Sequence, residues 1–316
     1  MAGKSKYILC KPAVVCFLAM LCCALWGSAF PFIKIGYGLF NIVSDDTPSK
    51  ILFAGIRFFA AGVLVIAFSS FNSKRIILPK RKSVSSIVVL SVFQTIMQYI
   101  FFYIGLSHTT GTKGSVLNST SVFFVLILAC VVFRQEKLNF QKTIGCMIGF
   151  AGTVIINLSQ GGADGGISFF GEGFIILSSL SYAVSSVLMK KYSTNEDPVA
   201  LSGYQFVLGG AVMTAAGLFA GGRLGVANIN AVLLLLYLAF VSAAAYTVWG
   251  VLLKYNDVSK VAVFSFMTPV FGCIFSAMFL KESLAGSLGK TIISLFLVSA
   301  GVIIVNMKFN FKGDKI

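Results

Sequence analysis

Hydrophobic positions occur in long, nearly continuous blocks that are separated by short polar linkers. The blocks cover about 13–36, 51–71, 84–107, 114–133, 142–159, 170–190, 199–220, 230–253, 261–280 and 287–307. A helix that crosses a bilayer needs about 20 mostly apolar residues, whereas a transmembrane strand needs about 10 with strict alternation. Only helices and closed barrels satisfy their backbones in lipid. The pattern therefore predicts an all-α integral membrane protein with ten transmembrane helices.

The same series of segments occurs twice along the chain. The first half contains Val122-Phe-Phe, an apolar helix and Glu136. The second half contains Pro269-Val-Phe, an apolar helix and Glu282. An internal repeat of this length constrains the fold more tightly than any single motif.

Each copy of the repeat holds five predicted spans, which is an odd number. The two copies, residues 1–160 and 161–316, are therefore expected to lie upside down to each other in the bilayer. Inverted five-helix repeats of this kind are typical of secondary transporters, whose substrate path lies between the halves.

The composition and the charge placement agree with a membrane protein. The chain is 57% hydrophobic and 11% charged, whereas about a quarter of the residues in a soluble domain are charged. The net charge is +15. If the N-terminus is cytoplasmic, most Lys and Arg residues fall on that side, as the positive-inside rule requires. We therefore expect a multi-pass protein of the plasma or inner membrane with both termini cytoplasmic, and no nucleic-acid partner.

The cysteines and the N-terminus indicate no further chemistry. The seven cysteines lie mostly within apolar blocks and form no CxxC pair, so we expect buried hydrophobic side chains and no metal site. The N-terminal apolar run continues through Trp26 to Ile35. It is too long for a signal peptide and is interpreted as the first retained span.

Several short motifs resemble those of one transporter family. They are Leu25-Trp26-Gly27-Ser28, Ile56-Arg57-Phe58, the two Val-Phe…Glu segments described above, and the endings Ala151-Gly152 and Ala300-Gly301. From about residue 13 to 306 the chain resembles the EamA-type, ten-helix members of the drug/metabolite transporter superfamily. The resemblance implies a ten-helix bundle with a substrate path between its halves, and export of small metabolites or amino acids.

Arg57 is the one charged residue deep within a predicted span. A charge at the centre of a bilayer costs about 3 kcal/mol on insertion scales, so a compensating interaction is expected. Arg57 either binds a carboxylate or phosphate of the substrate, or serves a structural purpose by bonding backbone carbonyls or reaching the outer surface. Its counterpart in the second half is Gln205, and we expect substrate contacts where the halves differ in this way.

Polar and aromatic side chains recur at helical spacing in the other spans. Gln94 and Gln98 are four residues apart and would share one face of an α-helix. Ser178, Tyr182 and Ser185 form a similar stripe in the sixth span. These groups either join helices by hydrogen bonds or line a polar cavity. The candidate substrate-binding residues are Trp26, Arg57, Gln94, Gln98, Asn118, Ser178, Tyr182, Ser185, Gln205, Tyr246 and Trp249.

Four residues are expected to have structural roles. Glu136 and Glu282 occupy matching positions at the ends of the fourth and ninth helices, where they would anchor loops. Pro31 and Pro269 each remove one intrahelical hydrogen bond. We expect both prolines to bend their helices, and hypothesise that these bends act as hinges.

Residue types that the spans lack exclude several classes of function. No Asp or Glu lies in the middle of a span, which disfavours proton-coupled export of cationic drugs. The single histidine and the lack of a P-loop leave no enzyme motif, so we expect no enzymatic activity and no cofactor. The sequence predicts a secondary transporter that exports a small polar metabolite or amino acid by alternating access. A facilitator or antiporter of a small organic anion is the alternative. The expected partners are the substrate and the bilayer, and the chain is a monomer or a homodimer.

Overall fold

The computed structural model describes residues 7–75, 77–109, 111–158, 168–225, 228–280 and 288–307, with the backbone alone at 111–113, 156–158 and 288. Every regular element in these ranges is helical, and none of them contains a strand. Nine continuous helical stretches among the described residues, some made of several consecutive elements, are long and apolar enough to cross a membrane. The prediction of an all-helical, multi-pass membrane protein is confirmed at that level.

The helices of the first half follow the predicted blocks closely. They are α2 (Pro12–Leu39), α3 (Thr47–Ser73), α4 (Val84–Leu90), α5 (Gln98–Ser107), α6 (Gly111–Ser119), α7 (Ser121–Ile127) and α8 (Phe140–Leu158). The 3-10 turn η1 (Arg81–Ser83) precedes α4, the π-helical segment η2 (Ser91–Met97) joins α4 to α5, and π-helical η3 (Leu128–Val132) continues α7. The third and fourth predicted spans are therefore each built from several pieces.

The second half has the same kind of construction. Its elements are η4 (Phe169–Gly173), α9 (Phe174–Tyr192), α10 (Pro198–Phe219), α11 (Ile229–Tyr255), α12 (Val258–Ala262), η5 (Val263–Phe266), α13 (Met267–Leu280) and α14 (Leu288–Asn306). The ninth predicted span is thus interrupted by the 3-10 segment η5 between α12 and α13.

One predicted span stands apart from the nine. The block 142–159 corresponds to α8, but its apolar part with described side chains, Phe140–Ile155, is shorter than the other candidates. Among the described residues the structure therefore supports nine spans by length and composition.

Short polar signals set where several helices begin. The carboxylates of Asp46 and Asp197 accept hydrogen bonds from the backbone N–H of Ser49 and Val199, each at 3.0 Å. Each carboxylate is followed by a proline within the first two helical positions. An acidic cap and an early proline both favour helix initiation, because they use the N–H groups that the first turn leaves unpaired.

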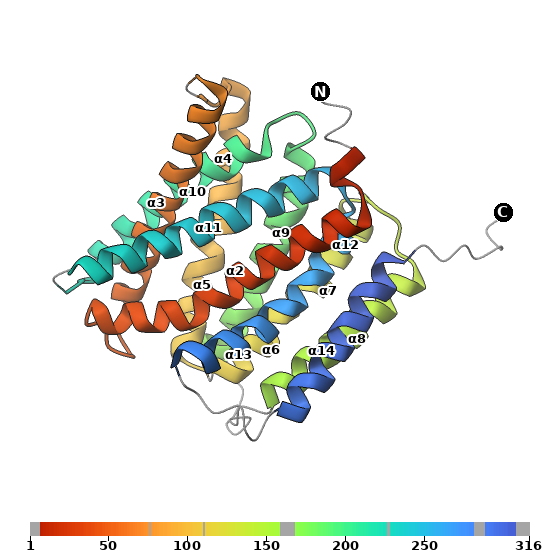
Figure 1. The fold of residues 1–316 in the computed structure, drawn as a ribbon. Coiled ribbons are helices and arrows are strands. Elements are labelled where there is room, and N and C mark those ends of the chain that lie inside the picture. Colours follow the sequence, from red (N-terminus) through yellow and green to blue (C-terminus); the bar gives the residue numbers. More distant parts are fainter. Residues whose placement is uncertain are drawn as a thin grey trace.

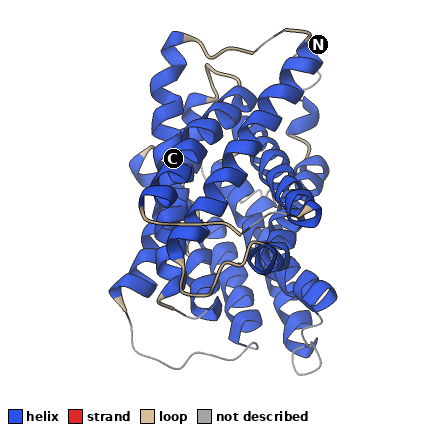
Figure 2. Ribbon diagram, turned by 90° about the vertical axis from the view of Figure 1, so that its left-hand side faces the viewer, coloured by secondary structure: helices blue, strands red, loops and turns tan. Residues whose placement is uncertain are grey.

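The two halves are interleaved in space. α3 lies along α10 on one side of the bundle, and α8 lies along α14 on the other. α2 lies between these pairs and contacts both α11 and α13 (Figure 1). A view turned by 90° shows helices joined by short loops (Figure 2). Since each of these contacts joins the first half to the second, neither half forms a separate domain.

Glycine allows α3 and α10 to touch through their backbones. A Cβ atom added to Gly210 would lie 2.3 Å from the backbone nitrogen of Phe59, and one added to Gly55 would lie 2.4 Å from that of Thr214. Lipid tails are as apolar as side chains, so helices in membranes associate through close packing of this kind. The α3–α10 contact therefore depends on the absence of side chains at these two positions.

We expect Gly210→Ala to destabilise the protein by about 1–3 kcal/mol, as overpacking of a tight contact does. The added methyl group meets backbone, which cannot move aside as a flexible side chain can. Gly38→Ala is the matched control, because nothing lies within 4 Å of a Cβ at that position. Thermal unfolding of both variants in detergent measures the difference, and equal melting temperatures would contradict the packing argument.

Candidate functional site

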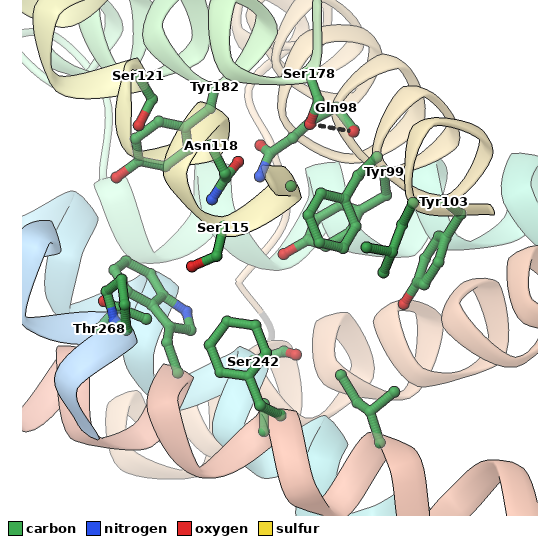
Figure 3. A pocket seen from close by; sticks show the side chains of 18 of the residues that line it. Gln98, Tyr99, Tyr103, Ser115, Asn118, Ser121, Ser178, Tyr182, Ser242 and Thr268 are labelled. Atoms are coloured by element: carbon green, nitrogen blue, oxygen red, sulfur yellow. Dashed lines mark hydrogen bonds between the residues drawn. The ribbon is translucent and has the colours of Figure 1, made fainter. Parts of the chain in front are cut away.

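A cavity of about 390 Å³ lies between helices of both halves. Small-molecule sites usually measure about 300–1,000 Å³, so the cavity is suited to a small metabolite. It is lined by Trp26, Ala29, Phe30, Ile33, Lys34, Tyr37, Arg57, Gln98, Tyr99, Phe102, Tyr103, Leu106, Gly114, Ser115, Asn118, Ser119, Ser121, Ser178, Tyr182, Val241, Ser242, Tyr246, Ser265, Thr268 and Pro269. Figure 3 shows hydroxyl and amide groups on several sides of this space.

The cavity is placed toward one end of the bundle. Lys34 and Tyr37 lie near the end of α2, Leu106 lies near the end of α5, and Gly114 lies near the start of α6. The lining contains no residue from the first turns of α2 or from α12. The site is therefore asymmetric along the helix axes.

The structure brings together many of the predicted substrate-binding residues. Those that line the cavity are Trp26, Arg57, Gln98, Asn118, Ser178, Tyr182 and Tyr246. Lining residues that the sequence reasoning did not single out include Tyr37, Ser115, Ser242 and Thr268. A hydroxyl in a span is as often a packing residue as a cavity residue, so spacing alone could not have separated them.

Four predicted residues lie outside the cavity: Gln94, Ser185, Gln205 and Trp249. The side-chain carbonyl of Gln205 accepts a hydrogen bond from Thr95 at 2.7 Å. Ser185 donates to the carbonyl of Tyr182 in its own helix at 2.8 Å. Gln94 does not line the cavity beside Gln98. It lies in η2, which packs against α10, and its side-chain carbonyl is buried without a described partner.

Arg57 lies ten residues after the start of α3, which is about 15 Å along the helix. The side chain does not reach the surface, since only 3% of the residue is exposed. Its guanidinium carbon lies 4.4 Å from the ring centroid of Phe58 and 5.9 Å from that of Tyr99. Among the described residues no hydrogen-bond or ion-pair partner of Arg57 is found. The surroundings of Arg57 therefore support neither bonding to backbone carbonyls nor an extension of its side chain to the outer surface.

A small hydrogen-bond network lies beside Arg57. The hydroxyl groups of Tyr99 and Tyr246 share a hydrogen bond of 2.6 Å, and the side-chain amide of Gln98 donates to the Tyr246 hydroxyl at 3.5 Å. Ser178 donates to the backbone carbonyl of Gln98 at 2.7 Å (Figure 3). This carbonyl belongs to the junction of η2 and α5, so Ser178 holds the irregular turn that carries Gln98 and Tyr99.

Ser179 has a similar function that the sequence did not reveal. Its hydroxyl lies 3.2 Å from the carbonyl of Leu117 and 3.3 Å from that of Asn118. Both carbonyls precede the interruption between α6 and α7 at Thr120. The neighbouring serines of α9 therefore satisfy the backbone of two irregular helices at the cavity wall.

Aromatic rings form a second wall. The ring of Trp26 meets Tyr246 edge-on at 5.1 Å between centroids and Trp249 at 4.9 Å. Trp249 is thus a support behind Trp26 and not a lining residue. The indole N–H of Trp26 is buried with no described partner.

Glu136 and Lys142 form a buried ion pair at the opposite end of the bundle. Only 4% of the Glu136 side chain and 6% of the Lys142 side chain is exposed. Glu136 also accepts hydrogen bonds from the hydroxyl and, at 3.0 Å, from the backbone N–H of Ser259. Since Ser259 belongs to α12, this contact joins the two halves. We refer to Glu136, Lys142 and Ser259 as the inter-half cluster.

The partner of Glu136 is Lys142 and not the adjacent Lys137. The side-chain carbonyl of Asn139 accepts from the backbone N–H of Lys142 at 2.8 Å. This bond caps the first turn of α8 and directs Lys142 back toward Glu136. The predicted counterpart Glu282 lies outside the described residues.

The connection between α11 and α12 adds further charges to this end. Asp257 pairs with Lys260 at 3.0 Å and lies 3.9 Å from Lys142. Partial burial by itself would raise the pKa of Asp257, but the hydrogen bond and charge of Lys260, with Lys142 and Lys190, lower it. The side-chain amide of Asn256 donates to the carbonyl of Leu9 at 3.0 Å, and that of Asn306 donates to the carbonyl of Lys260 at 3.3 Å. The beginning and the end of the described chain therefore meet here.

The sequence profile of the EamA-like transporter family matches residues 13–158 and 169–307. The chain belongs to this family. An uncharacterized transporter of Archaeoglobus fulgidus is 30% identical over 84% of this chain and 89% of its own. A Salmonella typhimurium protein named as a probable amino-acid metabolite efflux pump is 27% identical, over 85% of this chain and 88% of its own. The predicted resemblance is thereby confirmed.

A solved crystal structure shares the fold of this EamA-like chain. Its TM-score is 0.74 at 16% sequence identity, and the match covers 94% of this chain and 98% of the other. At this identity the likeness concerns the fold alone. The architecture described above is therefore one that another sequence also adopts.

We expect Glu136→Gln and Lys142→Met each to destabilise the protein by about 3–5 kcal/mol, because each leaves the other charge buried without its closest partner. The double variant Glu136→Gln/Lys142→Met leaves no unpaired charge and should recover most of the loss. Chemical unfolding of all four proteins gives the coupling energy as a double-mutant cycle. Additive losses would mean that the two side chains do not interact.

Proposed function

We propose that this EamA-like transporter is a secondary transporter that exports a small polar metabolite or amino acid by alternating access. One observation carries the proposal. A cavity of small-molecule size, lined by both halves, lies toward one end of the bundle, while the buried inter-half cluster joins the two halves at the other end. In alternating access, these two ends open in turn around a fixed site.

Ten spans with inverted halves are part of the proposal. Leu9 and Asn306, near the two ends of the described chain, both bond to the α11–α12 region. Both ends on one side require an even number of crossings, so α8 is counted as the tenth span. The two profile matches, 13–158 and 169–307, support the division into two halves.

The side of the membrane is proposed from the charges. Most Lys and Arg residues fall on the side of the N-terminus, which supports a cytoplasmic location for both termini in the plasma or inner membrane. The inter-half cluster then closes the cytoplasmic side, and the cavity lies toward the outside. Both halves of the chain contribute to the lining, and this arrangement is compatible with a monomer or a homodimer.

The proposals of export and of the substrate class are supported by similarity to other transporters and by the residues that line the cavity. The family resemblance and the efflux-pump name of the Salmonella relative favour export of an amino acid or metabolite. The second candidate, a facilitator or antiporter of a small organic anion, is favoured by the unpaired Arg57 in the cavity wall. The described lining contains no Asp or Glu that could serve an enzyme as general acid or base.

Pro269 is the better hinge candidate of the two prolines. It lies in the first turn of α13, directly after the 3-10 segment η5, and lines the cavity. Pro31 lies within the continuous helix α2. We propose that α12 and α13 move relative to each other about η5 during transport.

Everted membrane vesicles that contain the protein should accumulate a labelled amino acid or organic acid above vesicles from control cells. A panel of amino acids, organic acids and amines, used as competitors at two pH values, identifies the class. Ser115→Trp fills the cavity and should reduce uptake to the control level. Ser85→Trp is the matched control, because Ser85 is exposed and does not line the cavity. Uptake that survives Ser115→Trp would contradict this substrate path.

Alternating access predicts opposite changes at two cysteines. Cys146 is buried in α8, one turn after Lys142 and within electrostatic reach of the inter-half cluster. With the other six cysteines replaced, the double variant Glu136→Gln/Lys142→Met should increase labelling of Cys146 by a membrane-impermeant maleimide from the cytoplasmic side. In the same variant, a cysteine introduced by Ser115→Cys should become less reactive from the outside.

Lys260→Met is the control for this experiment. It removes the ion pair with Asp257, which lies at the same end of the bundle but within one half. Its labelling should equal that of the unmodified protein. An increase at both reporter cysteines would indicate loosening of the fold, and no change at Cys146 would show that the cluster does not close the path.

A further inference from the structure

Arg57 carries a buried charge that the described part of the protein does not neutralise. The residue is 3% exposed, and its Nε has no hydrogen-bond partner. Lys34, the other basic residue of the lining, has an interaction of its own. A buried cation is strongly unfavourable without a counter-charge. Arg57 therefore provides a free positive charge in the described cavity wall.

The aromatic rings around Arg57 compensate only part of this charge. The faces of Phe58 and Tyr99 attract the guanidinium group at 4.4 and 5.9 Å through cation–π interactions. The N–H groups of the guanidinium group form a planar fork that matches the two oxygens of a carboxylate, and a ring face does not offer that geometry. The N–H donors of Arg57 are therefore suited to a bidentate acceptor.

The hydroxyl pair beside Arg57 supplies one more donor. Tyr99 and Tyr246 have two hydroxyl protons between them, and their shared 2.6 Å hydrogen bond uses one. Neither hydroxyl donates to another described group, while Gln98 donates to Tyr246. One O–H therefore remains available next to the guanidinium group, and an anion bound there can accept from both.

The charge of Arg57 matches that of a carboxylate. The described lining contains no Asp or Glu that could neutralise the guanidinium group, and Arg57 by itself balances one negative charge. A phosphate monoester carries close to two negative charges at neutral pH, which Arg57 balances only in part. The ammonium group of a zwitterion could meet the side-chain carbonyl of Gln98, which is buried without a partner, or the face of Trp26.

From these contacts we infer that Arg57, with the Tyr99–Tyr246 hydroxyl pair, is a carboxylate-binding site, and that the transported molecules carry a carboxylate. The inference rests on the proposed function and makes its substrate class specific. Amino acids and simple monocarboxylates satisfy the site, whereas amines without a carboxylate do not.

Thermal unfolding of the purified full-length protein tests the site without any transport. The probes are phenylacetate, phenylacetamide and phenethylamine, which share one small aromatic skeleton and differ in charge. We expect phenylacetate alone to raise the melting temperature in a concentration-dependent way. Arg57→Gln should weaken its apparent affinity at least about tenfold, since charge-assisted bidentate pairs are among the strongest hydrogen bonds.

The melting temperature of the unliganded protein is a second test, because the two roles of Arg57 predict changes in opposite directions. If Arg57 awaits a substrate carboxylate, Arg57→Gln removes an uncompensated charge and should raise the melting temperature without ligand. A structural Arg57 would instead make this variant less stable. Arg57→Lys keeps the charge but loses the fork, and its affinity for phenylacetate should lie between those of the other two proteins.

Gln205→Met is the matched control, because Gln205 is the repeat counterpart of Arg57 and lies outside the cavity. It should leave the affinity for phenylacetate unchanged. Equal stabilisation by phenylacetamide or phenethylamine would overturn the inference, as would equal stabilisation of Arg57→Gln or none of the unmodified protein. If the protein binds carboxylates but vesicles show no uptake, the proposed transport function is contradicted and the carboxylate site is not. If vesicles take up amines and the protein binds no carboxylate, the carboxylate site is contradicted and the transport function is not.

Discussion

The lack of water in the bilayer interior is the constraint on which this structure depends. Every backbone N–H and C=O group within the membrane must find its partner in the protein, and long helices meet that demand. Two exceptions occur next to the cavity, at the π-helical turn before Gln98 and at the interruption near Thr120. There Ser178 and Ser179 accommodate the freed carbonyls. Irregular backbone thus occurs where the protein itself can satisfy it.

The site is asymmetric because positions that correspond in the sequence pattern face different surroundings. α3 and α10, the second and seventh predicted spans, pack closely against each other through Gly55 and Gly210. On α10, Gln205 is held by Thr95 between helices. On α3, the corresponding Arg57 faces the cavity. The shared backbone contact stabilises the bundle, and the difference between the two side chains gives the described cavity wall the charge of Arg57.

Sequence reasoning succeeded where one physical rule was sufficient. Polar side chains within a span face the protein interior or a cavity, and Arg57, Gln98 and Tyr246 do so. It was less successful where packing between helices decides which side chains reach the cavity. Gln94 was expected beside Gln98, but it lies in η2, which packs against α10, and does not line the cavity. Lys142 was not recognised as the partner of Glu136, because the capped start of α8 and not sequence adjacency brings them together.

The sequence by itself determined that the chain is a bundle of membrane helices, roughly where each helix begins and ends, and to which family it belongs. These properties follow from hydropathy and motifs, which are read one segment at a time. Only the tertiary structure decided which polar side chains meet, which of them line the cavity, and that Arg57 is left without a partner among the described residues. The rotation of each helix about its axis is set by packing against its neighbours, and hydropathy does not contain that information.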